Sequence, residues 1–168
     1  MIFKFLLFWL FPLTSFYTLS YSDIDGNAVS MNQFENKKVL LVNIATNSSR
    51  VSQLATLQQF HQIHGDSVVV IAFPSNSFGN EPLSNLQIKS FYQTNYSITF
   101  RIAGKIEVTG TAIHPIYAWL TDLSSNGVMG SPIGNDFQKF LVDKDGSLIG
   151  VFAPSVDPMS STFLSAIQ

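Results

Sequence analysis

Apolar residues occur along this chain either in continuous runs or at regular intervals, and the two arrangements predict different elements. The segments Lys37–Ala45 and Ser67–Phe73 are almost continuously apolar, which is typical of strands buried on both faces. Between them, over Ser49–His64, apolar side chains recur at helical spacing, and Gly65 then ends the pattern. We therefore predict a strand, a helix and a second strand, in that order.

Alternation around turn residues predicts two β-hairpins. Phe16–Gln33 alternates on either side of the turn dipeptide Asp25-Gly26. Near the end of the chain, Gln138–Val142 and Leu148–Phe152 flank the sequence DKDG. Strands are therefore expected at both ends of the folded domain.

The remaining segments complete an α/β pattern. We predict a loop over Asn76–Ser84, a helix over Leu86–Tyr96, a strand over Ile102–Val108, a helix over His114–Leu123 and a closing helix in the last ten residues. Strand, helix, strand, then a later hairpin and helix is the order of a thioredoxin-like fold. The expected architecture is a central mixed β-sheet flanked by helices, with an N-terminal β-hairpin.

The first fifteen residues have a different composition from the rest. One cation, Lys4, precedes the nine apolar residues FLLFWLFPL, and Thr14-Ser15 follows. A charged start and an apolar core too short to span a bilayer are typical of a signal peptide. We expect residues 1–15 to direct export to the periplasm or the outside, with a retained membrane anchor and a buried strand as alternatives. Membrane contact is expected only through this leader.

Composition limits the chemistry of the remaining domain, residues 16–168. The chain has 168 residues, 46% of them hydrophobic and 12% charged, which predicts one packed domain. A net charge of −2 offers no basic surface for nucleic acid. There is no cysteine, so disulfides, thiolate metal sites and thiol catalysis are excluded, and three histidines give no visible metal site. We expect no cofactor.

Four motifs nevertheless resemble those of the glutathione peroxidases, an enzyme family that works through a cysteine or selenocysteine. They are NIATNSS, FPSNSFG, HPIYAWL and FQKFLVDKDG, where the family has roughly NVASxCG, FPxNQFG, HPLYxxL and WNFxKFLVDxxG. The resemblance extends from about Phe16 to Ser165. It implies a thioredoxin-like fold of the glutathione peroxidase type, and it implies reduction of hydroperoxides with glutathione or thioredoxin as the partner.

The same resemblance places replacements at every catalytic position. The family's cysteine falls on Ser48, its glutamine on Ser77, and its Trp-Asn pair on Asn135 and Asp136. A peroxidatic residue must be a nucleophilic anion that can pass through a sulfenic acid, and a serine hydroxyl does neither. We therefore expect a catalytically inactive pseudo-peroxidase that binds an unknown protein or small molecule. An active peroxidase of the oxidative stress response is the alternative.

Two further alternatives remain open at these positions. If the four side chains converge, they form a small polar hollow with one carboxylate that would bind a polar or cationic ligand. A serine hydrolase would need a general base beside Ser48, but His61 and His64 lie about 20 Å or more along the predicted helix. Helix capping is the simpler role for Thr46, Asn47 and Ser48. The turns at Asp23 and at DKDG are interpreted as hairpin turns rather than calcium loops.

Overall fold

The computed structural model describes residues 15–168 and confirms the α/β architecture. Five strands form one mixed sheet in the order β5-β4-β3-β6-β7. β3 is parallel to β4 and β4 to β5, whereas β6 is antiparallel to both β3 and β7. The strands are β3 (Lys38–Ile44), β4 (Val68–Pro74), β5 (Arg101–Ile102), β6 (Lys139–Val142) and β7 (Leu148–Phe152).

The central strand β3 is buried along its whole length, as its apolar run predicted. Successive side chains of a strand point to opposite faces, so β3 contributes to two separate cores. Val39 and Leu41 belong to the core on one face, whereas Leu40, Val42 and Ile44 belong to the core on the other.

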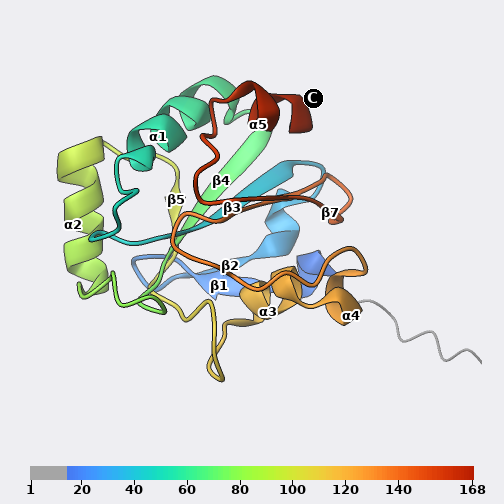
Figure 1. Ribbon diagram of the computed structural model, residues 1–168, viewed down its shortest axis with the longest axis horizontal. Coiled ribbons are helices and arrows are strands. Elements are labelled where there is room, and N and C mark those ends of the chain that lie inside the picture. Colours follow the sequence, from blue (N-terminus) through green and yellow to red (C-terminus); the bar gives the residue numbers. More distant parts are fainter. Residues whose placement is uncertain (1–14) are drawn as a thin grey trace, which may run out of the picture.

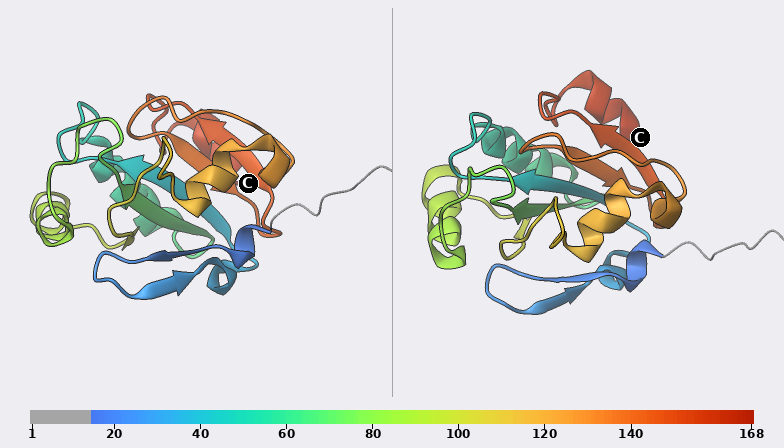
Figure 2. Two further views of the ribbon diagram at one scale, coloured as in Figure 1. Left: turned by 90° about the horizontal axis from the view of Figure 1, so that it is seen from below. Right: turned by 60° about the horizontal axis from the view of Figure 1, so that its bottom comes forward.

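Helices cover one face of the sheet, and short helices with a hairpin cover the other (Figure 1). α1, α2 and α5 pack on the first face, and α3, α4 and the β1–β2 hairpin pack on the second (Figure 2). The helices are α1 (Gln53–His64), α2 (Asn85–Tyr96), α3 (Pro115–Thr121), α4 (Leu123–Asn126) and α5 (Ser161–Ala166).

The N-terminal hairpin is present but shorter than predicted. β1 (Ser20–Ser22) pairs antiparallel with β2 (Ala28–Ser30), and Gly26 occupies the turn with a φ of 89°. The outer parts of the predicted hairpin are the 3₁₀ helices η1 (Phe16–Thr18) and η2 (Met31–Phe34). Alternation alone does not distinguish a strand from such a turn when the apolar residues are few.

Two predictions were wrong in detail. The strand predicted over Ile102–Val108 ends at Ile102, because the Gly104 N–H donates to Ser22 O and the Lys105 N–H donates to Asn85 Oδ1 instead of to a strand. The helix predicted over His114–Leu123 is divided at Asp122, whose extended backbone and side chain cap α4.

The predicted signal peptide lies outside the described residues, apart from Ser15. Within residues 15–168, no helix combines the length and hydrophobicity needed to cross a membrane.

Candidate functional site

Ser48, the residue that the motif resemblance predicts at the family's cysteine position, lies in the loop between β3 and α1. Its side chain is buried, with 5% exposed, and its Oγ accepts a hydrogen bond from the Arg50 N–H at 3.3 Å. α1 begins at Gln53, four residues later than the predicted Ser49. The intervening residues form turns in which a backbone N–H donates to the carbonyl oxygen three residues earlier, as the Val51 N–H does to Ser48 O. Ser48 therefore precedes the helix and is used in its entry turn.

A buried carboxylate holds the residues just before Ser48. Glu81 is wholly buried and accepts hydrogen bonds from the Thr46 N–H and hydroxyl, both at 2.8 Å. The Leu83 N–H and the Tyr92 hydroxyl complete its surroundings at 3.3 and 3.4 Å. Burial, and then the negative charge of Glu81, raise the pKa of Tyr92 well above its usual range. The Thr46 hydroxyl, predicted as a helix cap, thus binds Glu81 instead.

A second buried carboxylate, that of Asp136, is joined to the Ser48 loop through Asn80. The Asn80 side-chain amide donates to Asp136 Oδ2 at 2.6 Å, and its backbone oxygen accepts from the Asn47 N–H at 3.0 Å. Asp136 is wholly buried, and its Oδ1 has no partner among residues 15–168. Asn80 therefore connects the loop after β3 with the loop before β6.

Asn135 contributes to the same region mainly through local contacts. Its side-chain oxygen accepts from the Asp136 N–H at 2.8 Å, and its backbone oxygen accepts from the Asn43 side chain at 3.0 Å. Asn43 lies at the end of β3, so these contacts fix the position of the Asp136 loop against the sheet.

Ser77 belongs to a separate hydrogen-bond group. Its hydroxyl donates to Glu107 Oε2 at 2.6 Å and accepts from the Val108 N–H at 2.9 Å and from the Ser75 hydroxyl at 3.0 Å. These contacts attach its loop to the segment after β5. No recorded hydrogen bond joins Ser77 to Ser48, Asn135 or Asp136 within residues 15–168.

The histidines are placed away from Ser48. His61 and His64 lie in the last turn of α1, at the end far from Ser48, and His114 caps α3 by accepting the Ile116 N–H at Nδ1. Burial lowers the pKa of His61 and of His114. Within residues 15–168 the recorded hydrogen bond of Ser48 Oγ is with the Arg50 N–H, and no histidine is placed to act as its general base.

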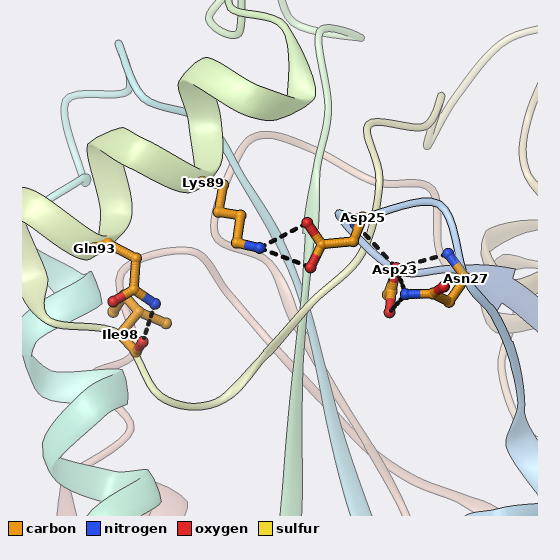
Figure 3. Close-up of polar contacts among 6 residues, drawn as sticks. All are labelled: Asp23, Asp25, Asn27, Lys89, Gln93 and Ile98. Carbon is orange, nitrogen blue, oxygen red and sulfur yellow. Dashed lines mark hydrogen bonds and ion pairs between the residues drawn. The ribbon is translucent and has the colours of Figure 1, made fainter.

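The acidic turn of the N-terminal hairpin is occupied by protein contacts (Figure 3). Asp23 accepts hydrogen bonds from the Asp25 N–H and from the backbone and side chain of Asn27. These hydrogen bonds lower the pKa of Asp23, the side chain of Asn27 having the largest effect. Asp25 forms a two-oxygen ion pair with Lys89 of α2 at 2.6 and 2.7 Å. Both carboxylates thus stabilise the hairpin and its contact with α2.

The sheet and its covering layers define a class of protein: a thioredoxin-like fold. A solved thiol:disulfide interchange protein of the thioredoxin family from Chlorobium tepidum has a TM-score of 0.62 to this structure, covering 93% of this chain and 94% of its own at 16% identity. At that identity the similarity shows the fold alone.

Closer comparisons define the family. The family model for glutathione peroxidase matches residues 16–121. A glutathione peroxidase of Lactococcus lactis subsp. cremoris is 34% identical over 146 residues, which are 86% of this chain and 92% of the relative. The solved structure of Trgpx in apo form has a TM-score of 0.70 and 29% identity, covering 93% of this chain and 97% of its own. The protein therefore belongs to the glutathione peroxidase family, as the four motifs predicted.

Sequence reasoning predicted four positions for the site but did not predict the roles of Glu81 and Asn80, whose hydrogen bonds fix the neighbouring loops. Neither Glu81 nor Asn80 belongs to the predicted site residues, and both lie in the predicted loop Asn76–Ser84. A charged residue within a predicted loop that is otherwise rich in Gly, Asn, Pro and Ser is the signal that pointed to Glu81. Its burial depends on contacts with Thr46, 35 residues earlier.

Proposed function

We propose that this protein is a pseudo-peroxidase: a member of the glutathione peroxidase family that does not reduce hydroperoxides and acts by binding a partner. The observation that carries the proposal is Ser48 at the cysteine position of a chain that contains no cysteine. The free thiol has a pKa near ~8.5 that a protein can lower, whereas a serine hydroxyl neither ionises near neutral pH nor forms a sulfenic acid.

The contacts around Ser48 support the proposal. Its Oγ is buried and accepts a backbone N–H, so it is used in a turn rather than presented to a substrate. The positions of the family's other catalytic residues hold Ser77, Asn135 and Asp136, each engaged in hydrogen bonds that fix a loop.

The direct test is steady-state reduction of hydrogen peroxide and of an organic hydroperoxide by the full chain, with glutathione and then thioredoxin as reductant. We expect no turnover above the reductant-only rate. The four methionines can each consume peroxide once, so only consumption well beyond four equivalents per chain counts as turnover. Turnover of that size would overturn the proposal in favour of the peroxidase activity named for the Lactococcus relative.

A Ser48→Cys variant separates loss of the nucleophile from loss of the whole site. We expect it to form little or no sulfenic acid under peroxide, because the new thiol would be buried and without the family's Gln and Trp. Strong peroxidase activity in this variant would show that only one residue had been lost. Labelling with dimedone and mass spectrometry measures the sulfenic acid.

One observation favours a second candidate function, the binding of a small cation at the former catalytic positions. Asp136 Oδ1 is buried without a partner among the described residues, and a cationic group would satisfy it. Thermal unfolding with ethylammonium chloride, compared with sodium chloride, tests this in the wild type and in Asp136→Asn. Equal shifts in both proteins would exclude the site.

The predicted leader makes export part of the proposal. If the protein is exported through a cleaved signal peptide, the mature chain purified from its host should begin after about residue 15. N-terminal sequencing of that protein measures it, and an intact Met1 would favour a retained leader.

A further inference from the structure

A cavity of about 430 Å³ lies at the end of the sheet opposite Ser48. It borders the start of β4, where Val69 pairs with Val39, whereas Ser48 follows the far end of β3. At about 3.3 Å per residue, the two places are roughly 15–20 Å apart along the strand. The cavity has a volume in the range of small-molecule sites, about 300–1,000 Å³.

The short edge strand β5 leaves this part of the sheet open. β5 pairs only with Ile71 and Ala72, so Val69 and Val70 border the cavity instead of another strand. The remaining walls come from η2, from Lys37 three residues after it, from the end of α1 and from the segment that leads into β5. The lining residues are Gln33, Phe34, Lys37, His61, Gly65, Val69, Val70, Thr99, Phe100 and Arg101.

The charged side chains of the lining are both cationic and both unpaired. Lys37 and Arg101 line the cavity, and no carboxylate does. Within residues 15–168 the one recorded ion pair is Lys89–Asp25, and neither the Lys37 ammonium nor the Arg101 guanidinium has a recorded hydrogen bond. His61 adds no full charge at neutral pH, since burial lowers its pKa.

The guanidinium of Arg101 is positioned by an aromatic ring. Its central carbon lies 5.1 Å from the centre of the Phe34 ring, and Phe34 is itself buried. A cation held against a ring in this way keeps its N–H groups available, and a guanidinium can bind a carboxylate or phosphate through two of them.

Direct contacts with α1 also fix the wall of the cavity that is formed by Thr99 and Phe100. Gln58 of α1 donates to the Thr99 hydroxyl at 2.7 Å and accepts the Thr99 N–H at 2.9 Å. The Phe100 ring meets the His61 ring edge to face, 6.1 Å between centres. The wall that carries Thr99 and Phe100 is therefore held in place before any ligand arrives.

We propose that this cavity binds a small organic anion, with a carboxylate or phosphate at Lys37 and Arg101 and an apolar or aromatic part against Phe100 and Val69. The inference does not depend on the proposed function, because it concerns the other end of the sheet. Unpaired cations beside an apolar floor match both halves of such a molecule.

The test is titration of the isotopically labelled full chain with four probes, followed by amide chemical shifts. The probes are phenylacetate, phenyl phosphate, inorganic phosphate and the uncharged benzyl alcohol. We expect at least one aromatic anion to shift the amides of Val69, Val70, Thr99 and Phe100, and to bind about tenfold or more tightly than benzyl alcohol, since hydrogen bonds to charged groups are the stronger ones. A stronger response to phenyl phosphate than to phenylacetate would assign a phosphoryl ligand, and the reverse a carboxylate.

Three variants establish the location. Arg101→Gln removes one cation, and we expect it to weaken binding of the best probe about tenfold or more. Val69→Phe fills the cavity while both cations remain, and it should weaken binding as well. Lys144→Gln removes an exposed cation that does not line the cavity and should change affinity less than twofold.

Three results would overturn the proposal. They are the absence of shifts with every probe, equal affinity for benzyl alcohol and the anions, and equal weakening by Lys144→Gln and Arg101→Gln. Circular dichroism of each variant checks that the fold is retained, which is expected for Arg101→Gln and Lys144→Gln because both side chains are exposed.

Discussion

Charged side chains at the two ends of the central sheet differ in their burial and in their hydrogen bonding. Near the carboxyl ends of β3 and β4, Glu81 and Asp136 are wholly buried and hydrogen-bonded to neighbouring loops. At the amino end of β4, Lys37 and Arg101 are exposed, border a cavity and have no recorded hydrogen bond or ion pair in the described part of the chain.

This difference shows two uses of charged side chains: some hold loops in place, and others are available to bind a ligand. Buried carboxylates lose their hydration and must recover it through hydrogen bonds, so Glu81 and Asp136 fix the loops around Ser48 whether or not a catalytic residue is present. Exposed cations keep their hydration without a protein partner, so they remain available to bind a ligand. The hydrogen bonds that hold these loops are therefore compatible with a chain that has no catalytic cysteine.

The largest expected effect is at Glu81. Glu81→Ala removes the acceptor for the Thr46 N–H and hydroxyl and leaves both donors buried. We expect the free energy of unfolding to fall by about 3–5 kcal/mol, measured by urea denaturation. Glu35→Ala, at an exposed carboxylate, is the control and should change it by less than about 0.5 kcal/mol. Equal effects of the two substitutions would refute a structural role for Glu81.

Asn80 should have the next largest effect. Asn80→Ala leaves the buried Asp136 carboxylate without its amide donor, which should cost about 2–4 kcal/mol of unfolding free energy. The double variant with Asp136→Ala should cost less than the sum of the single variants, because removal of both partners leaves no unpaired charge. Strict additivity would mean that the two residues act independently.

Lys139 gives a prediction for pH dependence. This lysine is wholly buried, and its ammonium donates to Gln53 Oε1 and to Phe137 O, both at 2.8 Å. Burial lowers its pKa to about 8. Between about pH 8 and its unfolded pKa of ~10.4, the unfolded chain binds more protons than the folded chain, so unfolding free energy rises with pH in that window.

We expect the free energy of unfolding to rise by about 1–2 kcal/mol between pH 7 and pH 9.5. The rise follows from the lowered pKa of Lys139, since each pKa unit corresponds to about 1.4 kcal/mol. Above that, the raised tyrosine pKa values oppose it, because folded Tyr21 and Tyr117 keep protons that the unfolded chain loses. Denaturation series at several pH values measure the slope for the wild type and for Lys139→Met. A slope that persists in the variant would assign it to other groups.

The smallest effect is expected at the exposed ion pair in Figure 3. Asp25 and Lys89 remain 53% and 41% exposed, so solvent screens their attraction. A double-mutant cycle with Asp25→Ala and Lys89→Ala should give a coupling of about 0.5 kcal/mol or less, and it should vanish at high salt. A coupling above about 1 kcal/mol would show that the hairpin and α2 depend on each other more than exposure allows.

Local patterns predicted most of the fold because the forces behind them act over a few residues. The apolar runs gave β3 and β4, helical spacing gave α1 and α2, and the DKDG turn gave the β6–β7 hairpin. Predictions failed where backbone N–H groups donate to distant residues instead of to a neighbouring strand. After β5, for example, the Gly104 and Lys105 N–H groups donate to Ser22 and Asn85. A single sequence does not specify such partners.

The candidate site shows the same limit more strongly. The motifs placed Ser48, Ser77, Asn135 and Asp136, but Ser77 binds Glu107 thirty residues away, and Asp136 binds Asn80 across 56 residues. Each of these contacts depends on how several loops pack together. The four side chains expected to form a polar hollow belong to hydrogen-bond groups that share no recorded bond within residues 15–168.

The amino-acid sequence by itself determined most of the strands and helices, the family, and the absence of any thiol, because each is a property of composition or of local order. Only the tertiary structure decided that two carboxylates are buried as loop anchors and that two cations are left unpaired beside a cavity. Burial and pairing depend on which distant segments come together, and that is set by the packing of the whole domain.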